Sequence, residues 1–366
     1  MQNQPALEGR LLSLDFFRGL TMFLLIAEFT TLFNQMTDPS LEGTWLYTLG
    51  TQFHHHPWNG LRFWDLIQPF FMFIVGVAIP FSVTNREKKG QSRIEISAHV
   101  LQRSFLLLLL GWGLYCISAG QIVFRFQNVL AQLAVTYLIA YLIMRKAAGA
   151  QLLISFLLII ATEAIYRSFN VTGFEQAFVA NQNFGTWLDL QYGGEDLNGS
   201  WVSFNAIPTT AHTIWGVLAG QLLRSERSND QKLKILLIAG IIGVIIGYAL
   251  DPVTPIIKRI CTSSFILVSG GWTILALALC YWLIDIKGKR RAVLFFAIVG
   301  MNPLFIYLFA HVGGADFLRT IVWPFGASLM SWTTQLIMES MVSLIVLFLL
   351  WYICYWLYRK RIFIKI

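Results

Sequence analysis

The segment LIQPFFMFIVGVAIPFS, residues 66–82, contains no charged side chain. An α-helix needs about 20 consecutive, mainly apolar residues to cross the hydrocarbon core of a bilayer. The segment lies within a longer run, 61–84, that meets this requirement. Gly and Pro inside such a run are compatible with a membrane helix, because neighbouring groups satisfy the freed backbone atoms. We therefore interpret 61–84 as a membrane-spanning helix.

Similar apolar runs recur along the whole chain. Of its 366 residues, 56% are hydrophobic and 13% are charged, whereas soluble domains carry about 25% charged residues. The sequence predicts an all-α, polytopic integral membrane protein, a bundle of about ten transmembrane helices in a single domain, 1–366. The predicted spans are 12–33, 61–84, 98–118, 128–145, 150–167, 205–224, 234–250, 263–285, 292–312 and 332–358.

The positions of the basic residues predict the orientation of these helices. If the helices alternate in direction, 21 of the 27 Lys and Arg residues fall on the side of the N-terminus. Positive charge marks the cytoplasmic side, so both termini are expected inside. The net charge of +8 does not indicate nucleic-acid binding, because the charges sit in short loops between apolar runs.

Several familiar motifs are missing from the sequence. Four scattered cysteines form no C-x-x-C pair, so no metal site is expected. The sequence also lacks a phosphate-binding GxxxxGK[ST] loop, a GxGxxG fingerprint, an H-E-x-x-H motif and a G-x-S-x-G motif. These absences leave ATP hydrolysis, Rossmann-type redox chemistry, zinc-protease and nucleophile-elbow chemistry without support.

Ionisable side chains inside a membrane are costly, so each one is a functional candidate. Asp15 and Arg18 stand three residues apart in the first span and share one helix face. They form either a structural ion pair or part of a site. Glu28 lies about 20 Å further along the same helix. Arg103 and Asn302 add polar groups to the third and ninth spans.

Three histidines, His54–His56, precede the second span in HHHPWNGLRFWDLIQPFF, residues 54–71. Pro57 and Gly60 predict an irregular backbone here. A histidine can act as a general base near neutral pH, although a surface cluster without a role is the simpler interpretation of composition alone. Three consecutive residues cannot share one helix face, which disfavours a three-histidine metal site. Asp65 is placed either to orient His55 or to pair with Arg62.

Two long segments are expected outside, 34–60 and 168–204. The second carries acidic residues and no Lys or Arg, and long loops commonly carry binding functions. Its acidic residues are Glu175, Asp189, Glu195 and Asp196. The segments GVLAG, 216–220, and GVIIG, 243–247, have the G-x-x-x-G spacing that indicates close helix packing.

The order of motifs resembles that of the heparan-α-glucosaminide N-acetyltransferase family, including its short bacterial members, over nearly the whole chain. The similar stretches are RLLSLDFFRGL (10–20), HHHPWNGLRFWDLIQPFFMFIVGVAIPFS (54–82), VLAQLAVTYLIA (129–140), AIPTTAHTIWGVLAGQLL (206–223), PIIKRICTSSFILVSGG (255–271), CYWLIDIKG (280–288) and VGMNPLFIYLFAHV (299–312). The resemblance implies a transmembrane acyltransferase. Such an enzyme moves acetyl from cytosolic acetyl-CoA to an amino sugar on the far side of the membrane.

The resemblance also implies roles for individual residues. The catalytic histidine of the family stands three residues before the Trp of its Trp-Asn-Gly motif, which selects His55, and Asp65 is its expected partner. The family has an Asn eleven residues after the Arg of its Arg-Gly pair, and Phe29 stands there beside Glu28. This departure favours a different acceptor. We assign cofactor contacts to Arg18, Arg103 and Asn302, and substrate contacts to Glu28, Trp58, Asn59, Lys258 and Arg259.

The expected partners follow from this interpretation. They are acetyl-CoA as co-substrate, an amino sugar or glycan as acceptor, membrane lipid and a second copy in a homodimer, with no nucleic acid and no metal. The expected location is a bacterial inner (plasma) membrane. The alternative function is an amino-sugar transporter without acyl transfer. Transporters often contain inverted repeats, and no internal repeat is evident in the sequence.

The charge distribution generates a topology prediction. We expect residues 85–97 and 225–233 on the cytoplasmic side and 168–204 outside, because basic residues gather in the first two segments. Single cysteines placed in each loop, in a background without native cysteines, can be tested in intact cells with a membrane-impermeant thiol reagent. Only the 168–204 position should react, and labelling of the 85–97 position would contradict the topology.

Overall fold

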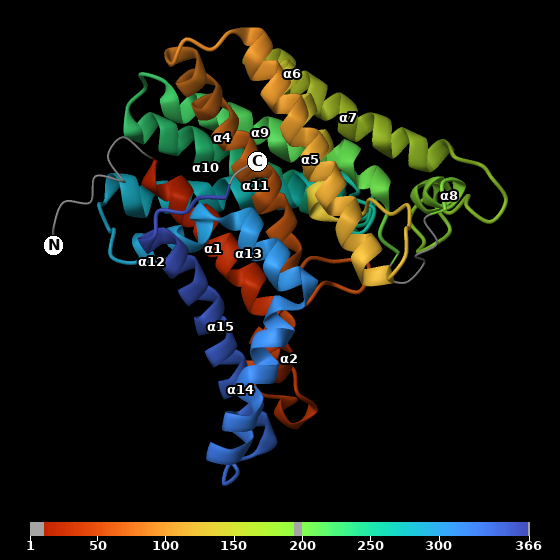
Figure 1. Cartoon of the computed structure of the whole chain (residues 1–366). Coiled ribbons are helices and arrows are strands. Elements are labelled where there is room, and N and C mark those ends of the chain that lie inside the picture. The colour runs from red at the N-terminus through yellow and green to blue at the C-terminus, as the bar shows by residue number, and fades with distance from the viewer. Residues whose placement is uncertain (1–10, 194–199, 365–366) are drawn as a thin grey trace. The chain divides into compact units, whose positions relative to one another are not determined.

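A computed structural model describes residues 11–193 and 200–364, shown along the chain in Figure 1. The described residues form helices and contain no β-strand. Two residues of the predicted acidic loop, Glu195 and Asp196, lie outside the described residues. The α-helices are α1 (Leu12–Glu28), α2 (Leu32–Met36), α3 (Trp45–Thr51), α4 (Ile67–Lys88), α5 (Arg93–Ala119), α6 (Val129–Ile143), α7 (Ala148–Ser168), α8 (Phe184–Gln191), α9 (Ala206–Arg224), α10 (Asn229–Leu250), α11 (Ser263–Cys280), α12 (Val293–Met301), α13 (Pro303–Phe309), α14 (Ala315–Leu329) and α15 (Gln335–Arg359).

Seven of the described helical segments are long and apolar enough to cross a membrane, which confirms the predicted fold class but not the count of ten. Shorter helices account for much of the difference, since α1 has 17 residues and α6 has 15. The α9 helix, with 14 of its 19 residues buried, is also outside this group. The seven segments are Phe63–Lys88, Arg93–Ala119, Ala148–Ser168, Asn229–Leu250, Ser263–Ile286, Pro303–Leu329 and Gln335–Arg359.

The predicted span 292–312 is wrong. The helix breaks at Asn302, whose φ of −126° and ψ of 50° are not helical. Pro303 then begins a second helical segment, because proline lacks an amide hydrogen and suits the first helical position. That segment, α13, is followed by Ala310–Gly314, where Val312 and Gly313 have non-helical backbone angles and kink the chain. The α14 helix then runs to Leu329. Residues 313–329, expected as a connecting loop, are therefore mostly helical.

The described residues divide into two compact units. Unit 1 comprises the chain up to His55, Arg62–Ile67, and the chain from Leu279 onward; unit 2 comprises His56–Leu61 and Gln68–Ala278. The chain thus passes from unit 1 to unit 2 after His55 and returns at Arg62. The residues expected in the site are distributed over both units, so each unit is described separately.

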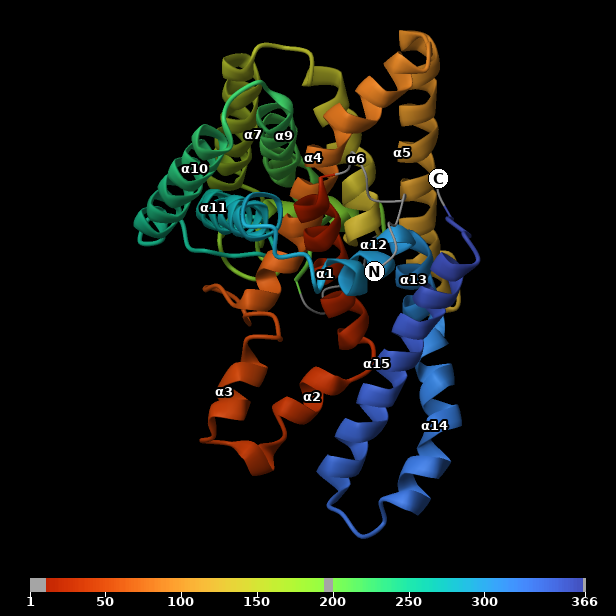
Figure 2. The same cartoon turned by 90° about the vertical axis from the view of Figure 1, so that its left-hand side faces the viewer.

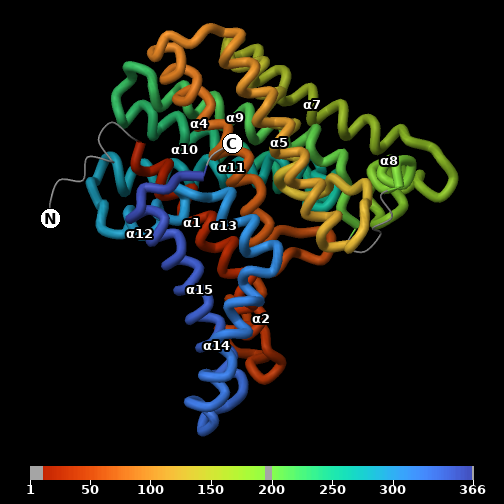
Figure 3. The backbone as a smooth tube through the Cα atoms, in the orientation of Figure 1, coloured from red at the N-terminus to blue at the C-terminus, as the bar shows by residue number. Residues whose placement is uncertain are grey.

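Unit 1 is built on α1 and the C-terminal helices. Gly19 of α1 lies directly against the backbone carbonyl of Phe296 in α12, where a side chain would not fit. The α14 and α15 helices form an antiparallel hairpin, seen in Figures 1 and 2 and in the backbone trace of Figure 3. Gly326 of α14 packs against Val342 of α15. Thr31, a non-glycine residue with a φ of 63°, directly precedes α2.

Unit 2 depends on glycines at two helix crossings. Gly216 and Gly220 of α9 lie against the carbonyls of Phe73 and Val77 in α4. In α10, Gly243 and Gly247 approach the backbone of α11 at Gly271 and Val268. Both G-x-x-x-G segments therefore mediate close helix packing, as the sequence predicts, because small residues let two backbones approach.

The α4–α9 crossing leads to a stability prediction. The change Gly216→Ala should destabilise the protein by about 1–3 kcal/mol, the usual cost of overpacking, because the new methyl group would overlap the Phe73 carbonyl. Thermal unfolding in detergent measures the effect. The matched control is Gly113→Ala on α5, where the added methyl meets open space and helix propensity improves. Equal melting temperatures for the two variants would contradict the packing argument.

Candidate active site

The central feature of unit 1 is a contact between His55 and Asp65. The imidazole Nδ1 lies 3.0 Å from Asp65 Oδ1. Asp65 is fully buried, while the His55 side chain keeps 35% of its surface exposed. When Asp65 is ionised, its carboxylate can only accept hydrogen bonds, and Nδ1 is then the nitrogen that donates to it. The contact therefore orients the ring with Nε2 on its opposite edge.

The backbone around Asp65 holds this carboxylate in place. Asp65 lies in a short 3₁₀ helix, Phe63–Leu66. Its second oxygen, Oδ2, accepts the backbone N–H of Arg62 at 2.9 Å. The Arg62 guanidinium donates to the backbone carbonyl of His55 at 3.1 Å. The Asp65 side chain thus contacts His55. Arg62 is hydrogen-bonded to both members of the pair, through its backbone N–H to Asp65 and through its guanidinium to the backbone carbonyl of His55.

The three consecutive histidines have different surroundings. Residues 54–62 form no helix, in agreement with the irregular backbone predicted from Pro57 and Gly60. His54 Nε2 lies 3.1 Å from Thr37 Oγ1 and 3.2 Å from the carbonyl of Phe33. The ring of His56, in unit 2, lies against Gly60. Only His55 of the three forms a contact with Asp65 among the described hydrogen bonds.

Glu28 is connected to the same 3₁₀ helix through Trp64. The buried indole of Trp64 donates from Nε1 to Glu28 Oε1 at 2.9 Å. Phe33 and Phe53 stack at 4.4 Å beside that indole. Trp64 and Asp65, adjacent residues of this 3₁₀ helix, therefore form hydrogen bonds with Glu28 and His55. An exposed carboxylate at the end of α1 can attract a cation.

Phe29, next to Glu28, packs against two other rings. Its ring lies edge-on to His311 at 5.4 Å and to Tyr307 at 6.3 Å. Phe29 therefore contributes an aromatic surface beside Glu28.

The predicted substrate residues of unit 2 gather around one loop. Asn59 forms an isolated bridge with Ile257, directly before Lys258 and Arg259. Both of those cations lie over the Trp201 ring, at 5.4 and 5.7 Å from its centroid. Trp58 donates from Nε1 to the carbonyl of Phe178 at 2.8 Å. Trp58, Asn59, Lys258 and Arg259 are therefore brought together in the fold.

The acidic segment 168–204 uses one of its carboxylates internally. Asp189 is buried and accepts hydrogen bonds from Gln127 Nε2, Tyr192 Oη and the backbone N–H of Ser203. Burial, together with the hydrogen bond to Asp189, raises the pKa of the Tyr192 phenol. Asp189 thus links this segment to Gln127, which lies just before α6. Glu175 is exposed and remains accessible to ligands.

The three residues assigned to the cofactor differ in their surroundings. Arg18 donates to Asp15 at 2.6 Å and is partly exposed. The Arg103 guanidinium lies over the Tyr137 ring at 4.8 Å and is also partly exposed. Asn302 is fully buried, and its amide binds the C-terminal segment through the carbonyl of Ile362 and the N–H of Ile364. The two arginines suit a phosphate, whereas Asn302 is already used by the chain itself.

A polar cluster around Arg319 was missed by the sequence analysis. Arg319 donates to the backbone carbonyl of Thr30 and to the hydroxyls of Thr31 and Ser343. Gln35 joins the cluster through Thr31 and Ser343. The misassignment of 313–329 as a loop concealed this cluster. A single arginine inside the apolar run ADFLRTIVWPFGASL (315–329) was the signal for it.

The fold and this geometry define a polytopic membrane protein with a histidine–aspartate pair. The sequence pattern of the family described as heparan-alpha-glucosaminide N-acetyltransferase, catalytic, matches residues 10–250, and the chain belongs to this family. It is 26% identical to human heparan-alpha-glucosaminide N-acetyltransferase over 428 residues, which covers 99% of this chain. The mouse protein of the same name is 33% identical over 138 residues, covering 36% of this chain and 18% of the mouse protein.

The chain spans 60% of the length of the human relative. The alignment includes the segment with His55 and Asp65 because it covers nearly the whole chain. Because this chain spans only part of the human relative, an activity like that of the relative is a proposal for this chain.

The contacts of Asn302 generate a prediction about the C-terminal segment. The change Asn302→Ala should speed amide hydrogen exchange in the segment 360–364, because both side-chain hydrogen bonds are lost. Each such bond contributes about 0.5–1.5 kcal/mol, which corresponds to an acceleration of about 2–10-fold per bond. Asn34→Ala, at an exposed position of α2, is the control. Unchanged exchange in the Asn302 variant would show that other contacts hold the segment.

Proposed function

We propose that this protein is a membrane acyltransferase that moves an acetyl group from acetyl-CoA to an amino sugar or glycan. The observation that carries the proposal is the contact of His55 with buried Asp65 in a chain of the N-acetyltransferase family. The family membership supplies the reaction class, and the pair supplies a base with a defined orientation.

The proposed chemistry requires a proton acceptor at His55. When the amine nitrogen attacks the thioester carbonyl, a C–N bond forms, the C–S bond breaks and the amine loses a proton. His55 Nε2 takes that proton, since Nδ1 is engaged with Asp65. The thiolate of CoA leaves with the electron pair of the C–S bond and is protonated afterwards. Asp65 stabilises the imidazolium that results, as a positioning residue does in related catalytic pairs.

A second route uses the same atom of His55. Nε2 first attacks the thioester and carries the acetyl group, which then passes to the amine. Both routes require Asp65 to keep Nε2 directed at the acetyl group. The two routes differ in one respect: only the second forms an acetyl-histidine intermediate.

The acceptor and the donor carry opposite charges. A protonated amino sugar is expected to be attracted by Glu28, the exposed carboxylate linked to Trp64. It must release one proton to water before its nitrogen can attack, and His55 then takes the second proton as the amide forms. Trp58, Asn59, Lys258 and Arg259 are proposed as further acceptor contacts. Acetyl-CoA is anionic, and Arg18 and Arg103 are proposed as its phosphate contacts, on the side that carries most of the basic residues. Asn302 joins that assignment only if the C-terminal segment releases it.

The setting of the reaction is also a proposal. The seven long apolar helices support a multi-pass location, and we propose a bacterial plasma membrane with cytosolic acetyl-CoA and an external acceptor. A homodimer is proposed as the assembly, with membrane lipid around it.

The proposed role of His55 leads to the central functional test. Purified protein incubated with acetyl-CoA and glucosamine should release CoA, which a thiol reagent detects. His55→Ala should lose about 10²–10⁴-fold in this rate, the range for removal of a general base. Acetyl-CoA binding should persist, because Nδ1 and Nε2 serve the transfer step. Asp65→Asn should also lower kcat, because an amide does not hold the same tautomer of His55.

The neighbouring histidines supply matched controls for this test. His56→Ala should keep most of the activity, and His54→Ala should mainly lower stability through its contacts with Thr37 and Phe33. Comparable CoA release by all three histidine variants would contradict the assignment. Movement of labelled sugar without any CoA release would favour the transporter alternative.

A further inference from the structure

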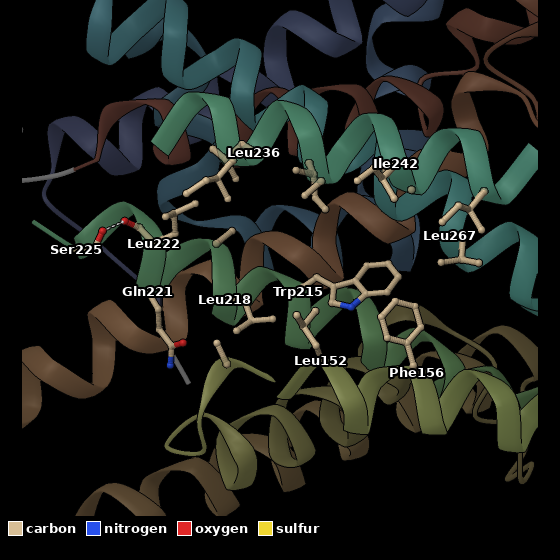
Figure 4. A pocket seen from close by; sticks show the side chains of 18 of the residues that line it. Leu152, Phe156, Trp215, Leu218, Gln221, Leu222, Ser225, Leu236, Ile242 and Leu267 are labelled. Carbon is tan, nitrogen blue, oxygen red and sulfur yellow. Dashed lines mark hydrogen bonds between the residues drawn. The ribbon is translucent and has the colours of Figure 1, made fainter. Parts of the chain in front are cut away.

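Unit 2 contains an apolar groove, separate from the residues assigned to catalysis. It has a volume of about 510 Å³ and lies between α7 and α10, with residues of α9 and α11 completing its lining. Figure 4 shows Leu218, Trp215 and Phe156 along one wall and Leu236 and Ile242 along the other. Phe156 and Ile242 are 42% and 50% exposed. The groove is therefore an open, apolar surface feature of helices expected to face lipid.

The dimensions of the groove suit a single hydrocarbon chain. Its lining along α10 runs from Ile235 to Ile246, which is about 16 Å at the α-helical rise per residue. One leaflet contributes half of the hydrocarbon core of about 30 Å. The lining along α10 is therefore about as long as the part of an acyl chain that lies in one leaflet.

The polar lining residues lie at one end of the groove. Gln221, Ser225 and Arg227 are found where α9 ends and α10 begins. In Figure 4, Gln221 and Ser225 lie at the end opposite Phe156. Arg227 is exposed, and Lys146, two residues before the lining residue Ala148, is exposed as well. Both loops belong to the side predicted to be cytoplasmic. This end therefore offers positive charge, whereas the Ser225 hydroxyl and the Gln221 amide already donate to the backbone carbonyls of Leu222 and Met144.

We propose that the groove binds one acyl chain of an anionic phospholipid from the cytoplasmic leaflet, with the headgroup at Arg227. The apolar part buries the chain, as hydrophobic burial favours. The basic end attracts a negative headgroup, an interaction of about 1 kcal/mol per Lys or Arg near a membrane surface. Two features of the groove indicate this class of ligand: its apolar lining is about one leaflet long, and one of its ends carries Arg227.

Native mass spectrometry of the delipidated full chain can test this site. The probes are phosphatidylglycerol and phosphatidylcholine with identical acyl chains, added at equal concentrations. The protein should retain phosphatidylglycerol in preference. Ile242→Trp should abolish the retained lipid, because the indole fills the groove. Arg227→Gln should reduce the preference for phosphatidylglycerol by about fivefold, the ratio that corresponds to about 1 kcal/mol.

Two matched variants complete the experiment. Ile245→Trp lies on the same helix, is 61% exposed and does not line the groove, so it should retain lipid as the unaltered chain does. Arg93→Gln removes an exposed positive charge at the start of α5 and should keep the preference. Equal retention by the Ile242 and Ile245 variants would overturn the proposal. So would an unchanged preference in Arg227→Gln, or a lipid-free dimer that Ile242→Trp dissociates.

Discussion

A buried carboxylate is stable only where hydrogen-bond donors replace the water it has lost. Asp65 meets this condition with two donors, the imidazole of His55 and the backbone N–H of Arg62. The same interactions start the 3₁₀ helix and fix the histidine ring. Folding of this segment and orientation of the proposed base are therefore one event. A change that weakened Asp65 would disturb both the local backbone and the chemistry.

Close backbone packing supplies the rigidity that such a pair needs. In unit 1, Gly19 allows α1 to contact α12, and α1 carries Glu28 at its end. In unit 2, glycines allow α9 to contact α4 and α10 to contact α11. Hydrophobic burial alone drives helix association weakly in lipid, so close van der Waals contact becomes the main source of order. The chemistry rests on helices whose positions small residues determine.

Much of this arrangement follows from the sequence because its physical causes are local. Apolar run length identifies helices, glycine spacing identifies their close contacts, and Pro57 with Gly60 predicts the irregular backbone around His55. Position along the chain also makes Asp65 a natural partner for His55. The selection of His55 among three histidines had a different source, since it came from the resemblance to a family.

Other features depend on contacts that sequence separation hides. Asn302 breaks a helix that hydropathy alone presents as continuous, and its amide binds Ile362 and Ile364, some 60 residues away. Arg319 reaches Thr30 and Thr31 across nearly the whole chain. In both cases one polar side chain forms hydrogen bonds with backbone or hydroxyl groups that lie beside an interruption of a helix. A polar residue beside a helix break in a membrane protein is thus first expected to form hydrogen bonds with the backbone groups that the break exposes. Such a residue can also bind a ligand only if part of its side chain remains accessible. By this criterion His55 and Glu28 are stronger ligand-binding candidates than Asn302.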